Sequence, residues 1–311
     1  MEAKTSNRLI IIAFMLTVLF AGNNAIAVRF SNAELPPFFG AAVRFAIAAL
    51  ILFLLVLILR LPLPRGRSLL GAMIYGAIGT GLNYALLYWA LEYIRPGLSM
   101  IILALVPLLT FLFAFFHRLE SFRWSALFGA LIAVAGIGTI ARDQLSLNVP
   151  LLPLLAVVGG AACFSEATIV IKTFPQSHPI TTNAVGLFTG SMLLFLFSAL
   201  GRETPTLPTL PATWEALFYL ILFGSVATFV LTVYVIKHWT ASASSYQFVL
   251  FPIVTVSVSA LLTKETIRPS LLLGGLLVLL GAYIGGIART DQIKRIYTGF
   301  TSRLRPCAPD C

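Results

Sequence analysis

Two ionisable side chains stand inside long apolar stretches of this sequence. Glu166 lies in the run LAVVGGAACFSEATIVIK at 155–172, and Arg44 lies in an apolar run at 37–59. An ionisable group inside a membrane-spanning segment is costly and usually faces a cavity, so each residue is a candidate for binding or coupling. An apolar setting favours the neutral form of a carboxyl group, which suits a group that exchanges a proton or meets an ammonium. An arginine fork can donate to both oxygens of a carboxylate.

We expect Glu166 to face a central cavity, but both residues also have a structural interpretation. Glu166 could pair with Arg44, or with Lys172, which lies about 9 Å further along a helix at 1.5 Å per residue. Such a pair would hold helices together without taking part in binding. Lys172 could also extend its charge toward the cytoplasm. The position of Arg44 within its apolar run favours neither interpretation.

Further polar residues in the apolar runs are weaker candidates for the same site. Asparagine and glutamine commonly form hydrogen bonds between helices, so each also has a structural interpretation. Two tyrosines at helical spacing could line a cavity. These uncharged candidates for substrate binding or coupling are Asn23, Asn24, Asn83, Gln247, Tyr84 and Tyr88.

Two prolines and two glutamates punctuate the apolar runs at matching places. Pro107 and Pro252 each remove one backbone hydrogen bond in mid-helix, and we predict that they are flexing points for gating. Glu120 and Glu265 lie at the ends of apolar runs, where the positive end of a helix favours an acid. We predict a structural role for both glutamates.

The composition identifies the apolar runs as membrane spans. Of the 311 residues, 59% are hydrophobic and 10% are charged, whereas a soluble domain has about 25% charged residues. A net charge of +10 in so apolar a chain indicates lysine and arginine in cytoplasmic loops rather than a nucleic-acid partner. The three cysteines form no disulfide framework, and Cys307 and Cys311 lack the nearby histidines of a zinc site. We therefore predict neither a metal nor a cofactor.

The elements that must position these residues are ten helices, because about 20 apolar residues cross the hydrocarbon core. The sequence thus predicts an all-α integral membrane protein whose partners are the lipid bilayer and a small-molecule substrate. The predicted spans cover 9–29, 37–59, 68–91, 97–116, 123–141, 150–171, 179–200, 213–236, 241–263 and 269–288.

The basic residues predict the orientation of these spans. With the N-terminus inside, 14 lysines and arginines fall on the cytoplasmic side and 6 on the other side. The positive-inside rule then places both termini in the cytoplasm, with the protein in the plasma (inner) membrane. The first span also resembles a signal peptide that ends at Ala25-Ile26-Ala27, but its apolar part is long for such a peptide.

The sequence repeats itself after about 145 positions. At that shift Gly79-Thr80 meets Gly224-Ser225, Pro107 meets Pro252, and Glu120 meets Glu265. The first helices match at a shift of 143, which pairs Asn23 with Glu166, Arg29 with Lys172, and Pro36 with Pro179. The repeat predicts a first five-helix unit at 1–145, a second at 146–290, and a basic cytoplasmic tail at 291–311.

An odd number of spans in each unit makes the second unit cross the membrane in the opposite direction. Such inverted repeats are typical of secondary transporters, whose substrate site lies near the midplane where the repeats meet. Inverted repeats also build channels, and a duplicated gene can encode another activity, so both alternatives remain open here.

The fourth and fifth spans of each unit resemble a known family. The stretches are VPLLTFLFAFFHRLESFRWSALFGALIAVAGIGTI at 106–140 and FPIVTVSVSALLTKETIRPSLLLGGLLVLLGAYIGGI at 251–287. With ten spans in two units, they are similar to the EamA branch of the drug/metabolite transporter superfamily. The first helix departs from the family pattern, because AGNNAIAVRF at 21–30 lacks the usual tryptophan before its glycine.

The resemblance implies a secondary carrier that exports amino acids or other small metabolites, often in exchange for protons and without ATP. The chain has no G-x-x-x-x-G-K-[ST] phosphate loop. An enzyme would need a cluster of catalytic residues, which the spacing does not provide. A passive channel would need a continuous polar lining, for which the polar residues are too sparse. A drug efflux carrier and a membrane subunit of some partner remain alternatives.

Overall fold

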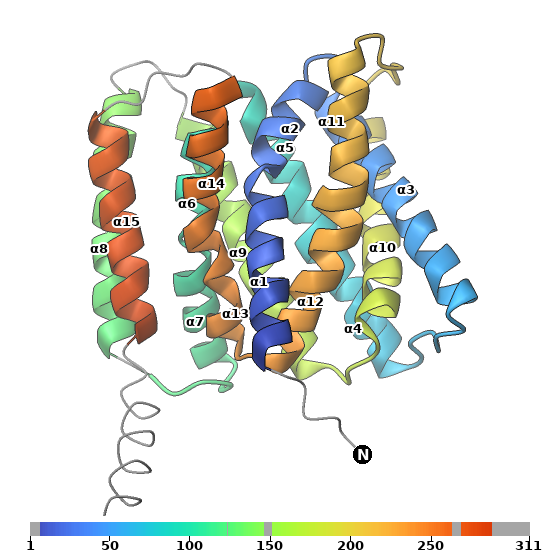
Figure 1. Ribbon diagram of the computed structural model, residues 1–311, viewed down its shortest axis with the longest axis horizontal. Coiled ribbons are helices and arrows are strands. Elements are labelled where there is room, and N and C mark those ends of the chain that lie inside the picture. The colour runs from blue at the N-terminus through green and yellow to red at the C-terminus, as the bar shows by residue number, and fades with distance from the viewer. Residues whose placement is uncertain (1–6, 123, 146–150, 263–268, 288–311) are drawn as a thin grey trace, which may run out of the picture.

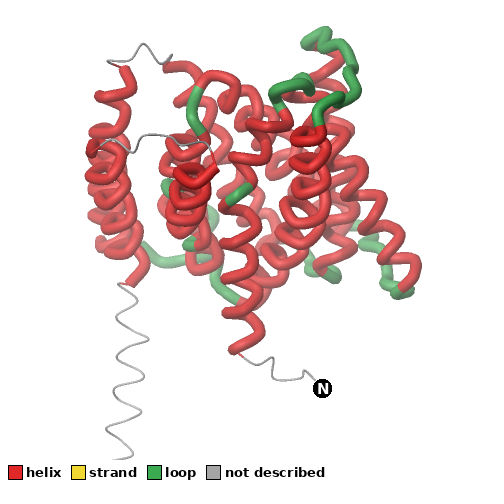
Figure 2. The backbone as a smooth tube through the Cα atoms, turned by 45° about the horizontal axis from the view of Figure 1, so that its top comes forward, coloured by secondary structure: helices red, strands yellow, loops and turns green. Residues whose placement is uncertain are grey.

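The computed structural model describes residues 7–122, 124–145, 151–262 and 269–287, and every regular element in these ranges is a helix (Figure 2). Two of the elements, η1 and η2, are π-helical turns. The elements are α1 (Asn7–Gly22), α2 (Asn24–Ser31), α3 (Pro37–Ile58), α4 (Arg67–Tyr75), η1 (Gly76–Leu82), α5 (Asn83–Tyr93), α6 (Pro96–Leu103), α7 (Val106–Phe116), α8 (Trp124–Leu145), α9 (Leu151–Thr173), α10 (Pro179–Leu200), α11 (Pro211–Ile221), η2 (Leu222–Ala227), α12 (Thr228–His238), α13 (Ala241–Ser245), α14 (Gln247–Leu262) and α15 (Pro269–Ile287).

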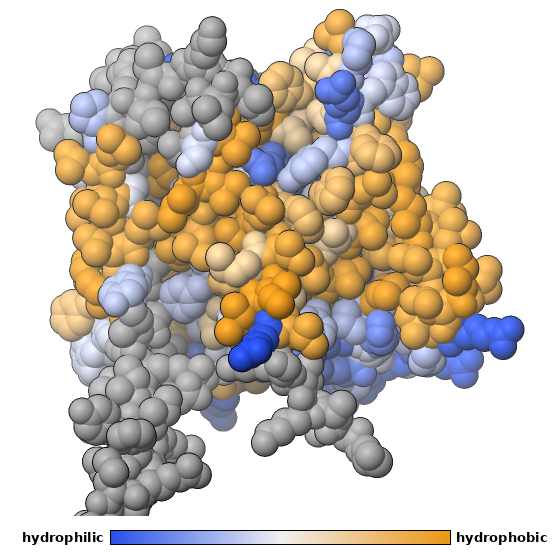
Figure 3. Space-filling view, in the orientation of Figure 1, coloured by the Kyte–Doolittle hydropathy of each residue, from blue (hydrophilic) through white to orange (hydrophobic). Residues whose placement is uncertain are grey.

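The helices are those of a multi-pass membrane protein. Within the described residues, seven helical stretches are long and apolar enough to cross a bilayer, and each coincides with a predicted span. They are Arg8–Ser31, Pro37–Ile58, Arg67–Tyr93, Pro96–Phe116, Leu151–Thr173, Pro179–Leu200 and Pro211–His238. The three other predicted spans also fall on helices, namely α8, α13 with α14, and α15. Apolar side chains cover the visible sides of the bundle, and much of the hydrophilic surface gathers at its lower edge (Figure 3).

Helices from distant parts of the sequence pack along each other. Helix α3 lies along α10 and α8 lies along α15, while α1 packs against α12 and α14 (Figure 1). Gly76 allows η1 to approach α10 backbone to backbone, because a Cβ at this position would overlap Gly186. Such close approach through small residues is how membrane helices gain packing energy without a hydrophobic driving force.

Several spans are interrupted near their middle. The break between α1 and α2 falls at Asn23, and the break between α6 and α7 falls directly before Val106 and Pro107. Proline has no N–H to donate to the preceding turn, so the helix restarts with Pro107 in its first turn. Pro252, by contrast, lies inside the continuous helix α14. A helix break thus lies at Pro107, whereas α14 continues through Pro252.

Three glutamates cap helices that are distant in sequence. Glu203 accepts the backbone N–H groups of Phe38 (3.1 Å) and Phe39 (2.8 Å) at the start of α3. Glu120 accepts the N–H (3.2 Å) and hydroxyl (2.7 Å) of Ser242 at the start of α13. These contacts agree with the structural role predicted for Glu120, because a carboxylate satisfies the free N–H groups of a helix N-terminus. Glu265 lies outside the described residues.

Glu34 makes the third cap, at the start of α11. Its carboxylate accepts the hydroxyls of Thr209 and Thr213 and the backbone N–H groups of Thr209 (3.1 Å) and Leu210 (3.0 Å). The hydroxyls of Thr209 and Thr213 contribute most to lowering the pKa of Glu34 from its ordinary 4.5 to about 2. All these bonds favour the ionised form. They join the segment after α2 to the segment before α11.

We expect Glu34→Gln to lower the melting temperature of the purified protein at pH 7. Because the pKa of Glu34 is lower in the folded chain than in the unfolded chain, its contribution is complete above about pH 4.5 and is lost as the pH falls toward 2. The difference in melting temperature between wild type and variant should therefore shrink on acidification. Glu215→Gln is the matched control, since Glu215 lies exposed on the same helix, α11. Equal melting temperatures for all three proteins at pH 7 would contradict the cap.

Candidate binding cavity

A cavity lies in the interior of the bundle among seven helices, and its lining comes from both halves of the chain. The cavity has a volume of about 50 Å³. Its walls are supplied by α1, α2, α5, α6, α9, α12 and α14. The lining residues are Ala21, Asn24, Ala25, Val28, Asn83, Tyr84, Leu87, Met100, Leu103, Phe164, Thr228, Phe229, Thr232, Gln247, Phe248 and Phe251.

Three amide side chains give the cavity wall its hydrogen-bonding capacity. Asn24, Asn83 and Gln247 are all buried, and the side-chain oxygen of each has no hydrogen-bond partner. The amide nitrogens of Asn24 and Asn83 are engaged, because they donate to the carbonyls of Gly224 (3.2 Å) and Gly79 (3.0 Å). A buried acceptor without a partner is costly. These three amide residues are therefore polar members of a mostly apolar wall.

The rest of the wall is apolar and aromatic. The ring of Tyr84 lies 5.9 Å from that of Phe229, and the ring of Phe248 lies 4.5 Å from Phe164 and 4.7 Å from Phe251. A mostly apolar pocket with a few fixed polar groups is the usual composition of a small-molecule site.

Arg44 lies directly behind this wall. Its side chain is completely buried, and its guanidinium carbon lies 5.4 Å from the centroid of the Tyr84 ring. Its nitrogens donate to the hydroxyl of Ser225 (2.7 Å), the hydroxyl of Tyr88 (3.0 Å) and the carbonyl of Gly224 (2.8 Å). All three acceptors are neutral. Arg44 and Tyr88 thus form a second layer, joined to the cavity through Tyr84 and through the Gly224 carbonyl that Asn24 also contacts.

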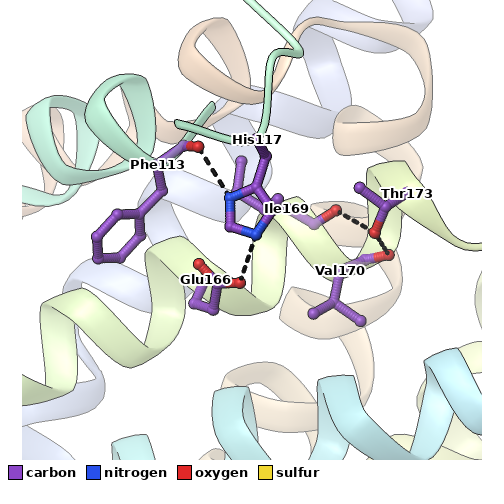
Figure 4. Close-up of polar contacts among 6 residues, drawn as sticks. All are labelled: Phe113, His117, Glu166, Ile169, Val170 and Thr173. Atoms are coloured by element: carbon purple, nitrogen blue, oxygen red, sulfur yellow. Dashed lines mark hydrogen bonds and ion pairs between the residues drawn. The ribbon is translucent and has the colours of Figure 1, made fainter. Parts of the chain in front are cut away.

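Glu166 is placed differently from our expectation. It does not line the cavity; its Oε1 lies 3.4 Å from Nε2 of His117, and Nδ1 of His117 lies 3.0 Å from the carbonyl of Phe113 (Figure 4). Neither of the ion pairs considered as a structural alternative for Glu166 is formed, because Arg44 is surrounded by neutral groups and Lys172 donates to the carbonyl of Trp239 (2.6 Å). Glu166 turns toward the residue after α7 rather than toward Arg44.

Asn23 also lies apart from the cavity lining. Its amide nitrogen donates to the carbonyl of Leu19 (3.1 Å), one turn earlier, at the break between α1 and α2. Among the predicted residues, the structure therefore brings Asn24, Asn83, Tyr84 and Gln247 into one wall and sets Arg44 and Tyr88 behind it. Within the described residues, no group of histidine, cysteine and acidic side chains is arranged to hold a metal ion.

The sequence reasoning missed the aromatic and threonine lining of the second half. Phe229 and Thr228 match Tyr84 and Asn83 at a shift of 145, and both pairs line the cavity. The signal that identifies Phe229 and Thr228 was thus present in the repeat.

Comparison with known proteins places the chain among transporters. The model of the EamA-like transporter family matches residues 8–142 and again residues 151–285. The chain is 24% identical over 281 residues to the "Uncharacterized transporter YoaV" of Bacillus subtilis (strain 168), covering 88% of this chain and 96% of that protein. It is 27% identical to the "Uncharacterized inner membrane transporter YedA" of Escherichia coli (strain K12), covering 82% of each chain.

Two further likenesses are to an exporter and to a solved structure. A "Probable terminal-alkyne amino-acid exporter" of Streptantibioticus cattleyicolor is 24% identical, covering 71% of this chain and 74% of that protein. A solved structure described as "Crystal structure of protein" superimposes with a TM-score of 0.68 at 18% identity, covering 92% of this chain and 99% of the other. At that identity the likeness shows the fold alone.

We expect Gly224→Ala to disturb the layer behind the cavity wall. A Cβ at position 224 would overlap Oδ1 of Asn24 and lie 3.0 Å from Nη2 of Arg44. Overpacking of this kind costs about 1–3 kcal/mol of unfolding free energy, and it should be measurable as a lower melting temperature. Gly275→Ala is the control, because its Cβ would meet Cδ1 of Ile101 at 3.9 Å. Equal stability of the two variants would contradict the close contact of Asn24 and Arg44 with Gly224.

Proposed function

Because the chain belongs to the EamA-like transporter family of the drug/metabolite transporter superfamily, we propose that it is a secondary transporter that exports small metabolites such as amino acids. In this proposal ten spanning helices form two inverted five-helix units, 1–145 and 146–290, and the cavity opens alternately to either side of the membrane. The likeness to an amino-acid exporter supports this class of cargo.

The observation that carries the proposal is the composition of the cavity wall. Ten of its residues form five pairs related by the repeat, at a shift of 143 in the first helix of each half and 145 in the later helices. A wall built from matching positions is what a pseudo-twofold axis through a central site requires. The pairs are Ala21 with Phe164, Asn83 with Thr228, Tyr84 with Phe229, Leu87 with Thr232, and Leu103 with Phe248.

Matching contacts at helix ends support the inverted arrangement. Arg29 donates to the carbonyl of Ile94 (3.5 Å), and Lys172, its counterpart, donates to that of Trp239, the counterpart of Ile94. The ring of Trp239 also lies 5.2 Å from that of Phe14 in the first half of α1. The end of α9 therefore lies near the first half of α1, as antiparallel first helices of two inverted units require.

The second helices of the two units, α3 and α10, match at a shift one residue smaller than the sequence suggested. Both α3 and α10 have 22 residues and begin at a proline, Pro37 and Pro179. Each is followed by an arginine with positive φ, Arg60 (49°) and Arg202 (54°). These landmarks set a shift of 142 for this helix, whereas the sequence alone paired Pro36 with Pro179 at 143. Adjacent prolines at 36 and 37 made the two registers indistinguishable.

The π-turns supply the irregular backbone around the proposed site. Turn η1 ends directly before Asn83 and Tyr84, and η2 ends directly before Thr228 and Phe229. π-Turns often occur at functional sites because they leave backbone groups free and re-aim side chains. We propose that Asn24, Asn83, Tyr84 and Gln247 contact the solute, and that Pro107 and Pro252 allow the fourth helix of each unit to bend.

The location and coupling follow from the same proposal. We propose that the protein lies in the plasma (inner) membrane with both termini in the cytoplasm, since lysine and arginine predominate in the loops on that side. We also propose that Glu166 and His117 form a proton-coupling pair, because an imidazole and a carboxylate in contact can pass a proton between them.

We expect proteoliposomes that contain the purified protein to take up labelled amino acids or related metabolites saturably. Uptake should be faster when the vesicles are preloaded with the same solute, since a carrier returns more quickly with cargo than without. Empty liposomes are the control. Flux that rises linearly with concentration and shows no trans-stimulation would favour a channel and would overturn the proposal.

Glu166→Gln should abolish transport or uncouple it from the pH gradient while leaving the protein folded. The substitution keeps the shape of the side chain but removes the group that exchanges a proton with His117. Uptake measured with and without an imposed pH gradient separates the two effects, and Glu215→Gln is the control on an exposed glutamate. A variant with the wild-type rate and pH dependence would remove Glu166 from the mechanism.

A further inference from the structure

Arg44 carries a positive charge in the interior without a compensating carboxylate. None of the carboxylates in the described part of the chain lies within ion-pairing distance of it, and its partners are two hydroxyls and one carbonyl. The rings of Phe45 and Tyr84 lie 4.7 Å and 5.4 Å from the guanidinium carbon. Burial of an ionised side chain is expensive even when its hydrogen bonds are made. The cost of burying the Arg44 charge indicates that this charge has a role in function.

The packing of the helices does not require a charged residue at the position of Arg44. In the register of 142 that relates α3 to α10, the residue at the position of Arg44 is Gly186. There the ring of Tyr75 fills the space beside the glycine, since a Cβ at 186 would meet Cδ1 of Tyr75 at 2.9 Å. The same place in the second half is thus packed by neutral groups. Arg44 therefore has no charged counterpart at the matching position of the second half.

The charge lies close to the cavity, and the groups between them are neutral. Tyr84 contacts Arg44 through its ring and lines the cavity, and Asn24 lines the cavity and shares the Gly224 carbonyl with Arg44. No lining residue is acidic or basic. In a poorly polarisable interior, a single charge behind a neutral wall is weakly screened and makes the electrostatic potential of the cavity positive.

We propose that Arg44 makes the cavity selective for solutes that carry a carboxylate or an equivalent anionic group, and that it excludes solutes whose only charge is positive. This inference rests on the proposed transport function and narrows its substrate class. In this proposal Asn24, Asn83 and Gln247, the amide residues of the cavity lining, provide hydrogen-bonding groups for the rest of the solute. Amino acids and hydroxy acids satisfy both requirements, whereas simple amines and quaternary ammonium compounds meet an uncompensated positive charge.

Matched solutes test the proposal. Each series holds the side chain constant and changes the charged groups: leucine, leucinamide, 3-methylbutylamine and 4-methylpentanoate, with the corresponding series for phenylalanine and threonine. The full-length protein is assayed in detergent for a ligand-induced rise in melting temperature and in proteoliposomes for uptake or competition. We expect the amino acid and the deaminated acid of at least one series to bind, and the amide and the amine of that series to bind at least tenfold more weakly.

Three variants assign the preference to Arg44. In Arg44→Met, which fills a similar volume without charge, the preference for the carboxylate should disappear, whereas Arg44→Lys should retain it in part. Arg95→Gln removes an exposed positive charge outside the cavity and should behave as wild type. Loss of packing alone would weaken all members of a series together, so the ratio between acid and amine is the decisive quantity.

Several results would overturn the proposal. These are amines or amides that bind as tightly as the acids, failure of every carboxylate in the panel to bind, or an unchanged preference in Arg44→Met. If that variant does not fold, the wild-type ratio and Arg44→Lys still decide. Saturable uptake of a cationic or neutral solute with no effect of the carboxylates would refute this selectivity and leave the transport function standing. Linear, unsaturable flux would instead refute the transport function.

Discussion

In the hydrocarbon region of a bilayer, a polar group must find its partner inside the protein, because lipid offers none. Many of the buried polar groups described here obey this constraint locally: Thr17, Ser165 and Thr168, for example, donate to carbonyls one turn earlier in their own helices. Some buried side-chain oxygens of the described residues lack a partner, and three of these oxygens belong to the cavity-lining residues Asn24, Asn83 and Gln247. Behind that wall, the Arg44 guanidinium lacks a counter-charge among the described residues.

The same constraint explains how the halves are held together. Apolar side chains gain little by leaving lipid for one another, so close backbone approach and polar end contacts must do more of the work. Gly76 and Gly186 permit such an approach within the bundle. At the bundle ends Glu34, Glu203 and Glu120 each cap a helix from a distant part of the sequence. These contacts lie outside the apolar interior, where they can break and form again with water as the alternative partner.

The sequence predicted the helices well and their neighbours poorly, for a physical reason. Span length follows from bilayer thickness, so the predicted 37–59 and 179–200 closely match Pro37–Ile58 and Pro179–Leu200. A side chain's partner depends instead on helix rotation and crossing, which apolarity hardly specifies. Glu166 therefore faced an unexpected residue, His117, although its placement in a helix was right. Amides and tyrosines are few in the apolar spans, so the sequence could single out Asn24, Asn83, Tyr84 and Gln247. The lining phenylalanines could not be distinguished from the other phenylalanines of the chain, which has 24.

Positions at which the two halves of the chain match and positions at which they differ have different consequences for a carrier. In the transport cycle that we propose, matching frameworks, such as Tyr84 with Phe229 and α3 with α10, allow two arrangements of similar free energy, one open to each side of the membrane. Binding a solute in one orientation requires the opposite, a wall whose two halves differ. Asparagine against threonine at 83 and 228, and arginine against glycine at 44 and 186, provide that difference. In the transport cycle that we propose, the symmetric residues thus govern the motion, and the asymmetric residues govern which molecule is carried.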